Sequence, residues 1–171
     1  GFRELQRIKS EGERWVANPA GRFHQLGVHE QWNVQILQRR QRALDVHLTG
    51  SMLAARAVVP AMKAAGQGSI VLVSSIYGMT GAAANLPYNV AKGGVLQLMR
   101  SLAADLGGFG VRANSVSPGY IETQMTAMIG AYPPVQEAFV RMHLLGRAGR
   151  PAEVAEAIAF LQTSFLTRQL A

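Results

Sequence analysis

The stretch from residue 69 to residue 119 constrains the fold of this chain more than any other. An aliphatic run at residues 69–73 predicts a strand that is buried on both faces of a parallel sheet. Apolar residues at three- and four-residue steps then predict a helix over residues 88–106, and residues 111–116 predict a second strand. Because parallel strands joined through a helix form a right-handed crossover, the sequence predicts an α/β fold.

Polar residues that could carry chemistry lie at the ends of these elements. Tyr88 and Lys92 are four residues apart, so they share one face of the predicted helix. A nearby ammonium favours the phenolate of a tyrosine, whose pKa is otherwise about 10, and so suits the phenol to acid–base catalysis. Ser75 follows the first strand, at the edge where open α/β sheets bind ligands.

Each of these features also has a simpler interpretation. Tyr88 and Lys92 could be a surface pair, Ser75 could be a hydroxyl bonded to the backbone, and Pro118–Gly119 could be only a turn. Their combination is harder to attribute to chance, because the whole chain has four tyrosines and three lysines.

Three segments resemble the short-chain dehydrogenase/reductase (SDR) family: residues 74–75, 88–92 (YNVAK) and 114–119 (NSVSPG). In that family the serine lies thirteen residues before the tyrosine, as Ser75 and Tyr88 do here. The resemblance covers residues 43–169 and implies an incomplete Rossmann-like, doubly wound domain. It further implies that Tyr88 is the catalytic acid/base and that Lys92 lowers its pKa while binding the nicotinamide ribose. Ser75 would position the substrate carbonyl or hydroxyl.

The same resemblance implies a cofactor, NAD or NADP, and hydride transfer between it and a small-molecule carbonyl or alcohol. The residues implied to contact the cofactor are Tyr88, Lys92, Pro118, Gly119, Ile121 and Thr123. The sequence does not decide between NAD and NADP, because the residues that read the ribose 2′ position belong to a part of the family pattern that is not matched. No metal site is expected.

His47 corresponds to an asparagine that, in the family, holds a water in the proton-relay path. An imidazole can also donate and accept hydrogen bonds, and with a pKa of about 6.5 it can carry a proton. His47 is therefore a fourth candidate catalytic residue. The alternative is a histidine packed on the apolar face of a helix over residues 43–66.

Residues 1–42 carry none of the family motifs. They show neither a strand-like apolar run nor the glycine-rich turn that brings a helix N-terminus to a pyrophosphate. We expect them to form an atypical basic extension, loose or helical, with residues 31–43 as its best helix candidate, before a catalytic part at residues 43–171. We also expect the chain to be truncated N-terminally, without the cofactor phosphate-binding half, as a deletion, a frameshift or a wrong start upstream would produce.

Residues 120–146 lie where the family places its substrate lid, and they are rich in apolar side chains: Met125, Met128, Ile129, Tyr132 and Phe139. An apolar lid would favour a lipophilic substrate, although the same residues would serve equally as core. Tyr77 could touch substrate or be an exposed loop aromatic. A last helix is expected from Pro151, with a buried stripe of Val154, Ala157, Ile158 and Leu161. Beyond it, residues 167–169 replace the family's turn before a closing strand.

The composition agrees with one soluble domain of 171 residues, 49% hydrophobic and without cysteine. We expect a cytoplasmic protein, because no apolar run could span a bilayer and no signal-like leader is visible. We also expect a homo-oligomer formed through helices 43–66 and 88–106, as in the family. Two alternatives remain: an inactive remnant that associates with intact family members, and a basic nucleic-acid-binding accessory protein. The net charge of +7 favours the latter, but no aromatic-interleaved basic motif accompanies it.

Overall fold

The computed structural model describes residues 14–17, 23–26, 41–82 and 85–163. The chain divides into two units, Gly1–Arg39 and Arg40–Ala171, which are described separately. The expected turn at residues 167–169 and most of the helix expected at residues 31–43 lie outside the described residues.

A short β-hairpin occupies the described part of the first unit. Strands β1 (Arg14–Ala17) and β2 (Phe23–Leu26) are antiparallel, with Trp15 opposite Gln25. The expectation of a loose or helical extension over residues 1–42 did not foresee this hairpin. Each strand has only four residues, too short for an apolar run to stand out, but Trp, Val and Phe are residue types that favour strands.

The second unit begins with a long helix. It starts at residue 41, contains a π-helical segment η1 (Leu44–Thr49), and continues as α3 (Gly50–Ala65). Gly66 ends it in the left-handed conformation, with φ of 63°, and its N–H bonds the carbonyls of Lys63 and Met62. The predicted helix over residues 43–66 is confirmed.

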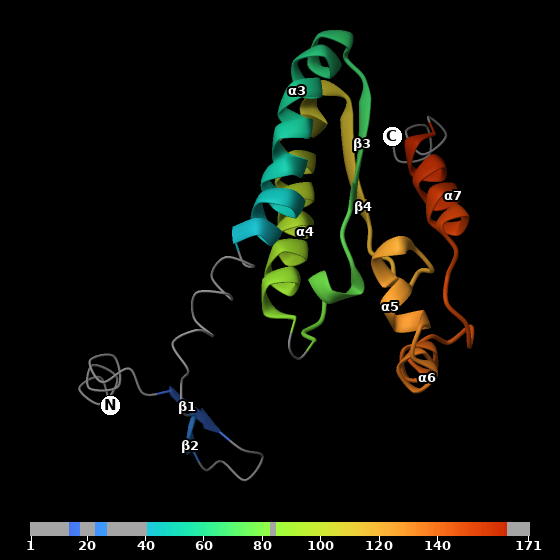
Figure 1. Cartoon of the computed structure of the whole chain (residues 1–171). Coiled ribbons are helices and arrows are strands. Elements are labelled where there is room, and N and C mark those ends of the chain that lie inside the picture. Colours follow the sequence, from blue (N-terminus) through green and yellow to red (C-terminus); the bar gives the residue numbers. More distant parts are fainter. Residues whose placement is uncertain (1–13, 18–22, 27–40, 83–84, 164–171) are drawn as a thin grey trace, which may run out of the picture. The chain divides into compact units, whose positions relative to one another are not determined.

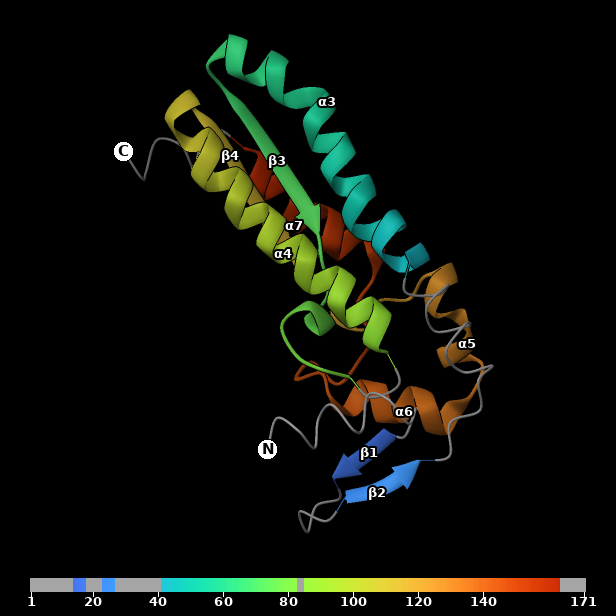
Figure 2. The same cartoon turned by 90° about the vertical axis from the view of Figure 1, so that its left-hand side faces the viewer.

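The predicted strand–helix–strand unit is also confirmed. β3 (Gly68–Val73) and β4 (Val111–Val116) are parallel, with Ile70 opposite Ala113, and α4 (Leu86–Leu106) connects them. α3 and α4 cover one face of the strand pair and α7 (Pro151–Gln162) lies on the other (Figure 1; Figure 2). The core forms between the strands and the first face, from Ile70, Leu72, Val95, Leu106, Val111 and Ala113.

The second face of the strands is less covered than we expected. Val73 is 45% exposed, so burial of this strand on both faces was a wrong prediction. α7 begins at Pro151 as predicted, but Val154, Ile158 and Leu161 are only partly buried and Ala157 is exposed. A single short helix cannot bury a whole sheet face, and this explains the difference.

The segment after β4 builds one wall of the site. It contains η4 (Gln124–Thr126), α5 (Ala127–Gly130) and α6 (Pro133–Arg141), and an isolated parallel bridge between Ile121 and Gly149 joins its two ends. Among the described residues, no helix is long and apolar enough to cross a membrane.

Candidate active site

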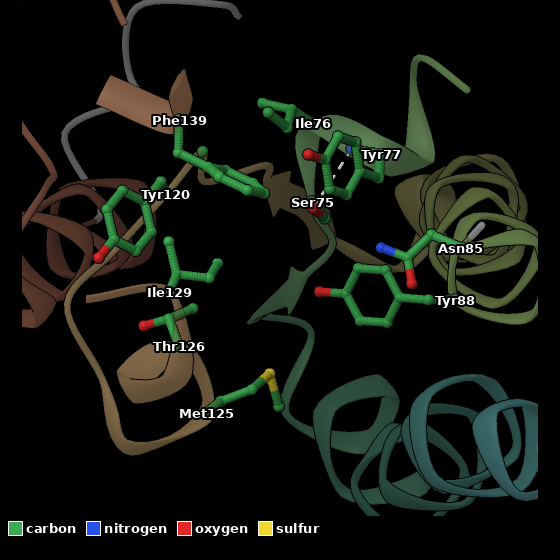
Figure 3. Close-up of a pocket in the computed structure, with 11 residues that line it drawn as sticks. Ser75, Ile76, Tyr77, Asn85, Tyr88, Tyr120, Met125, Thr126, Ile129 and Phe139 are labelled. Atoms are coloured by element: carbon green, nitrogen blue, oxygen red, sulfur yellow. Dashed lines mark hydrogen bonds between the residues drawn. The ribbon is translucent and has the colours of Figure 1, made fainter. Parts of the chain in front are cut away.

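Tyr88 lies in the first turn of α4, directly after Pro87, the second residue of the helix. Its side chain is partly buried and its hydroxyl points into a pocket (Figure 3). The helix therefore presents the phenol at the carboxyl end of β3, the edge at which ligands bind in open α/β sheets.

Lys92 lies one helical turn after Tyr88 and is 8% exposed. Its Nζ is 5.6 Å from the centroid of the Tyr88 ring and donates a hydrogen bond of 2.9 Å to the carbonyl of Val73. Burial lowers the pKa of Lys92, because the charged form loses solvation. The structure thus keeps an ammonium fixed between α4 and the end of β3, beside the phenol.

Ser75 is 7% exposed and is the second residue after β3. Its Oγ accepts a hydrogen bond of 3.2 Å from the backbone N–H of Tyr77, which caps the short helix η2 (Ile76–Gly78). A hydroxyl that accepts from the backbone still has its own proton to donate. Ser75 lines the same pocket as Tyr88, so both hydroxyls face one ligand position.

His47 approaches Tyr88 from η1, on the helix before β3. The two rings meet edge to face, with 5.3 Å between centroids and planes at 90°. Burial, and then the charge of Lys92, lower the pKa of His47 below its usual 6.5. This shift favours the neutral imidazole at neutral pH, and His47 is not among the described residues that line the pocket.

The residues expected to contact the cofactor divide into two groups. Gly119 lines the pocket, directly after Pro118, whose carbonyl accepts from the N–H of Ile76 at 3.1 Å and so joins the ends of the two strands. Ile121 pairs with Gly149, and Thr123 caps η4, where its hydroxyl lies 3.1 Å from that of Thr126. Neither Ile121 nor Thr123 is among the described residues that line the pocket.

The pocket itself has a volume of about 320 Å³ and opens to solvent. The lining comes from the end of β3, the start of α4 and the segment after β4: Ser75, Ile76, Tyr77, Asn85, Tyr88, Gly119, Tyr120, Met125, Thr126, Ile129 and Phe139. Among these described residues none carries a formal charge at neutral pH. The surface is mainly aromatic and aliphatic, with a few hydroxyls and one amide.

Three of the five expected lid residues line this pocket: Met125, Ile129 and Phe139. Met128 and Tyr132 are 75% and 59% exposed, so neither is core, and neither is among the described residues that line the pocket. Tyr77 lines the pocket, but sequence reasoning missed Ile76, Asn85, Tyr120 and Thr126. Nothing in the local pattern singles out Tyr120 and Thr126, since their place depends on how the segment after β4 folds back; Asn85 lies just before α4.

The residues around Tyr88 fit the nicotinamide–ribose part of a dinucleotide. A phenol and a buried ammonium are available for ribose hydroxyls, and glycine at position 119 leaves that side of the pocket without a side chain. The printed sequence lacks the glycine-rich turn that would hold the pyrophosphate.

A family model described as enoyl-(acyl carrier protein) reductase matches residues 15–167. The chain belongs to the short-chain dehydrogenase/reductase family. The family model begins to match at residue 15, within the segment 1–42 that carries none of the family motifs.

Curated relatives of this SDR chain are named as dehydrogenases. It is 40% identical over 146 residues to cis-4-hydroxycyclohexanecarboxylate dehydrogenase from Sinomonas cyclohexanicum, covering 85% of this chain and 54% of the relative. It is 42% identical over 120 residues to cyclopentanol dehydrogenase from Comamonas testosteroni, covering 70% and 48%. The chain thus spans about half the length of the curated relatives it matches.

Solved structures show the same fold. A gluconate 5-dehydrogenase from Burkholderia cenocepacia, in complex with NADP and tartrate, matches with a TM-score of 0.72 and 28% identity, covering 74% of this chain and 50% of that one. A 3-oxoacyl-[acyl-carrier protein] reductase from Brucella melitensis matches with a TM-score of 0.70 and 35% identity, covering 74% and 47%. The Rossmann-like fold class predicted from the sequence is confirmed.

Proposed function

We propose that this chain carries the catalytic part of an NAD(P)-dependent oxidoreductase that interconverts an alcohol and a carbonyl compound. The observation that carries the proposal is the convergence of the Ser75 and Tyr88 hydroxyls on one pocket, with buried Lys92 one helical turn from the phenol. The cofactor, when bound, supplies or accepts the hydride.

In the proposed reaction Tyr88 moves the proton. In the direction of reduction its hydroxyl donates a proton to the substrate oxygen as that oxygen gains charge, and in oxidation the phenolate takes the proton back. Ser75 donates a hydrogen bond to the same oxygen and so orients it. Lys92 stabilises the phenolate through its charge and, from its position on α4, binds the ribose of the cofactor.

The roles of five further residues stay predictions. His47, neutral and in edge contact with Tyr88, is suited to take over the proton that leaves the phenol side of the site. Pro118, Gly119 and, further along, Ile121 and Thr123 follow β4, and we propose that this segment borders the nicotinamide.

The substrate we propose is an uncharged, apolar alcohol or ketone of small size. A charged acid would need a cation beside it, and the described lining of the pocket offers only neutral groups. Ile76, Ile129 and Phe139 would instead bury aliphatic or ring carbons. The name of the cyclopentanol dehydrogenase among the relatives fits this class.

Association with another SDR subunit is part of the proposal. α3 and α4 carry exposed apolar residues, among them Met52, Leu53 and Val90, each about half exposed. This surface would serve a homo-oligomer, and it would equally serve a chain without activity that joins intact family members.

The first test is a titration of the purified chain with NADH and NADPH, measured by calorimetry. The second is an assay of turnover with cyclopentanol and cyclopentanone. We expect saturable binding that Lys92→Ala weakens, because the ammonium no longer meets the ribose. Tyr88→Phe should keep the binding and lose turnover by a factor of about 10²–10⁴, the usual contribution of a general acid–base group.

Ser75→Ala is the companion variant, since it removes a hydroxyl from the same pocket but not the proton donor. The absence of binding at millimolar cofactor would contradict the proposed enzymatic activity. It would favour an inactive chain that associates with intact family members. Equal turnover in wild type and Tyr88→Phe would contradict the role of Tyr88.

A further inference from the structure

His143 follows α6, outside every motif used so far, and both of its ring nitrogens are engaged. Nε2 lies 2.8 Å from the backbone nitrogen of Tyr120, whose N–H can only donate. Nε2 is therefore the acceptor. Nδ1 must then carry the proton, and it lies 2.8 Å from the carbonyl oxygen of Phe139, to which it donates. The contacts select one neutral tautomer of His143.

These two bonds join two segments of the pocket wall. Tyr120 and Gly119 belong to the turn after β4, and Phe139 belongs to the last turn of α6. The Tyr120 ring, 5% exposed, packs against Phe139 with 5.8 Å between centroids and against His143 with 6.4 Å. Gly119, Tyr120 and Phe139 all line the pocket, and Figure 3 shows Tyr120 and Phe139 across it from Tyr88.

The glycine at position 119 has a physical reason in this arrangement. Its φ is not in the left-handed region, so backbone conformation does not demand glycine. A Cβ at position 119 would instead overlap Nε2 of His143. Since the imidazole is fixed at both nitrogens, it cannot move aside without losing a hydrogen bond. Gly119 and His143 therefore fit each other as a pair.

We propose that His143 is a positioning residue of the active site. In its neutral form with the proton on Nδ1 it holds the Gly119–Tyr120 backbone against the end of α6, and it thereby sets the distance between the apolar wall and the Tyr88 hydroxyl. It acts through Gly119, Tyr120 and Phe139. The catalytic meaning of this role rests on the proposed function, but the contacts themselves do not.

The first experiment needs no turnover. Hydrogen exchange of the Tyr120 amide is measured by NMR in the full chain, with the Ser74 amide, which bonds the carbonyl of Val116 at 2.8 Å, as the internal control. We expect His143→Ala to raise the exchange rate of the Tyr120 amide at least tenfold and to leave that of Ser74 unchanged. His143→Gln should stay within about threefold of wild type, because its amide oxygen can accept at the place of Nε2.

Imidazole ¹⁵N shifts of the wild-type chain give the tautomer directly. We expect a protonated Nδ1 and an unprotonated Nε2 for His143. A protonated Nε2, or Tyr120 exchange that is the same in wild type and His143→Ala, would overturn the proposal.

A double-variant cycle tests the pairing of Gly119 and His143. Gly119→Ala alone forces the overlap with the imidazole, so it should lower the unfolding midpoint and loosen the Tyr120 amide. Adding His143→Ala removes the obstacle, and the double variant should be less impaired than the sum of the two single variants. Strictly additive effects would overturn the pairing.

Kinetics separate this proposal from the proposed function. With active enzyme, His143→Ala should raise KM about tenfold, more than it lowers kcat, and His143→Gln should restore it. Unchanged kinetic constants in His143→Ala would overturn the positioning role. If no turnover is found at all, the proposed function fails, while the exchange and double-variant results still decide whether His143 positions the pocket wall.

Discussion

At the scale of single residues, Lys92 is the most unusual feature of the site, because it is a cation held almost out of water. Burial lowers the pKa of Lys92 below the 10.5 of the unfolded chain, so the folded chain releases the ammonium proton at a lower pH. In the window between the folded pKa and 10.5 the unfolded state binds more protons, and stability due to Lys92 therefore rises with pH. Below that window Lys92 is charged in both states, and the cost of burying its charge lowers the stability of the folded chain in full.

Lys92→Met should remove this contribution. We expect the unfolding free energy of wild type, measured in urea from pH 7 to pH 10.5, to rise relative to that of Lys92→Met as pH increases. Lys63→Met is a suitable control, since Lys63 lies over the ring of Phe109 at the other end of the helices. Parallel curves for wild type and Lys92→Met would contradict the burial of a charged Lys92.

The sequence predicted Ser75, Tyr88 and Lys92 correctly as neighbours because their placement depends on local periodicity. A helix aligns residues four apart, and a parallel strand delivers its last residue to the same sheet edge. His143 and Tyr120 are 23 residues apart, and their bond depends on how the α5–α6 segment folds. Contacts of this kind leave no periodic signal, so neither residue was found.

At the scale of elements, the turn from α4 into β4 depends on one glycine. Gly110 has φ of 73°, and a Cβ there would overlap the carbonyl oxygen of Gly66, which ends α3. The two glycines let the ends of both helices approach at the start of the strand pair. Gly110→Ala should therefore lower the unfolding free energy by about 2 kcal/mol or more, from left-handed strain and from displacement of the Gly66 turn.

Gly108→Ala provides the matched control two residues earlier. Its φ is ordinary and its Cβ would meet open space, so we expect a change within about 0.5 kcal/mol. Urea denaturation of both variants makes the comparison. Equal losses in the two would mean that flexibility of the whole glycine run, and not the contact with Gly66, stabilises the turn.

The same scale shows where sequence reasoning succeeded and failed. Long elements with apolar periodicity, α3 and α4, were predicted within a few residues, and the parallel pair β3–β4 followed from their order. The hairpin β1–β2 was missed because four-residue strands hold too few residues for a pattern. Exposure of Val73 was missed for a different reason, since burial depends on what packs against a strand.

At the scale of the whole molecule, the strand pair and its helices form only part of the length found in relatives, and α3 and α4 expose apolar surface. A groove between these helices combines Met52, Val59 and Leu98 with charges of both signs, Arg56, Lys63 and Asp105. A surface that holds both signs can meet a copy of itself, as a two-fold interface requires.

We therefore expect self-association of the chain at micromolar concentration, and we expect Met52→Glu to shift it towards monomer. The methionine is 49% exposed, so a glutamate there is tolerated in the monomer but carries a charge into an apolar contact between copies. Phe160→Glu is the control, because Phe160 is 55% exposed and belongs to α7, which lies on the opposite side of the strand pair (Figure 1). Sedimentation velocity gives the masses. If the wild-type chain is a monomer, self-association through this groove is contradicted, and a different SDR subunit becomes the candidate partner. If Phe160→Glu dissociates the oligomer and Met52→Glu does not, the interface lies on α7 and not at the groove.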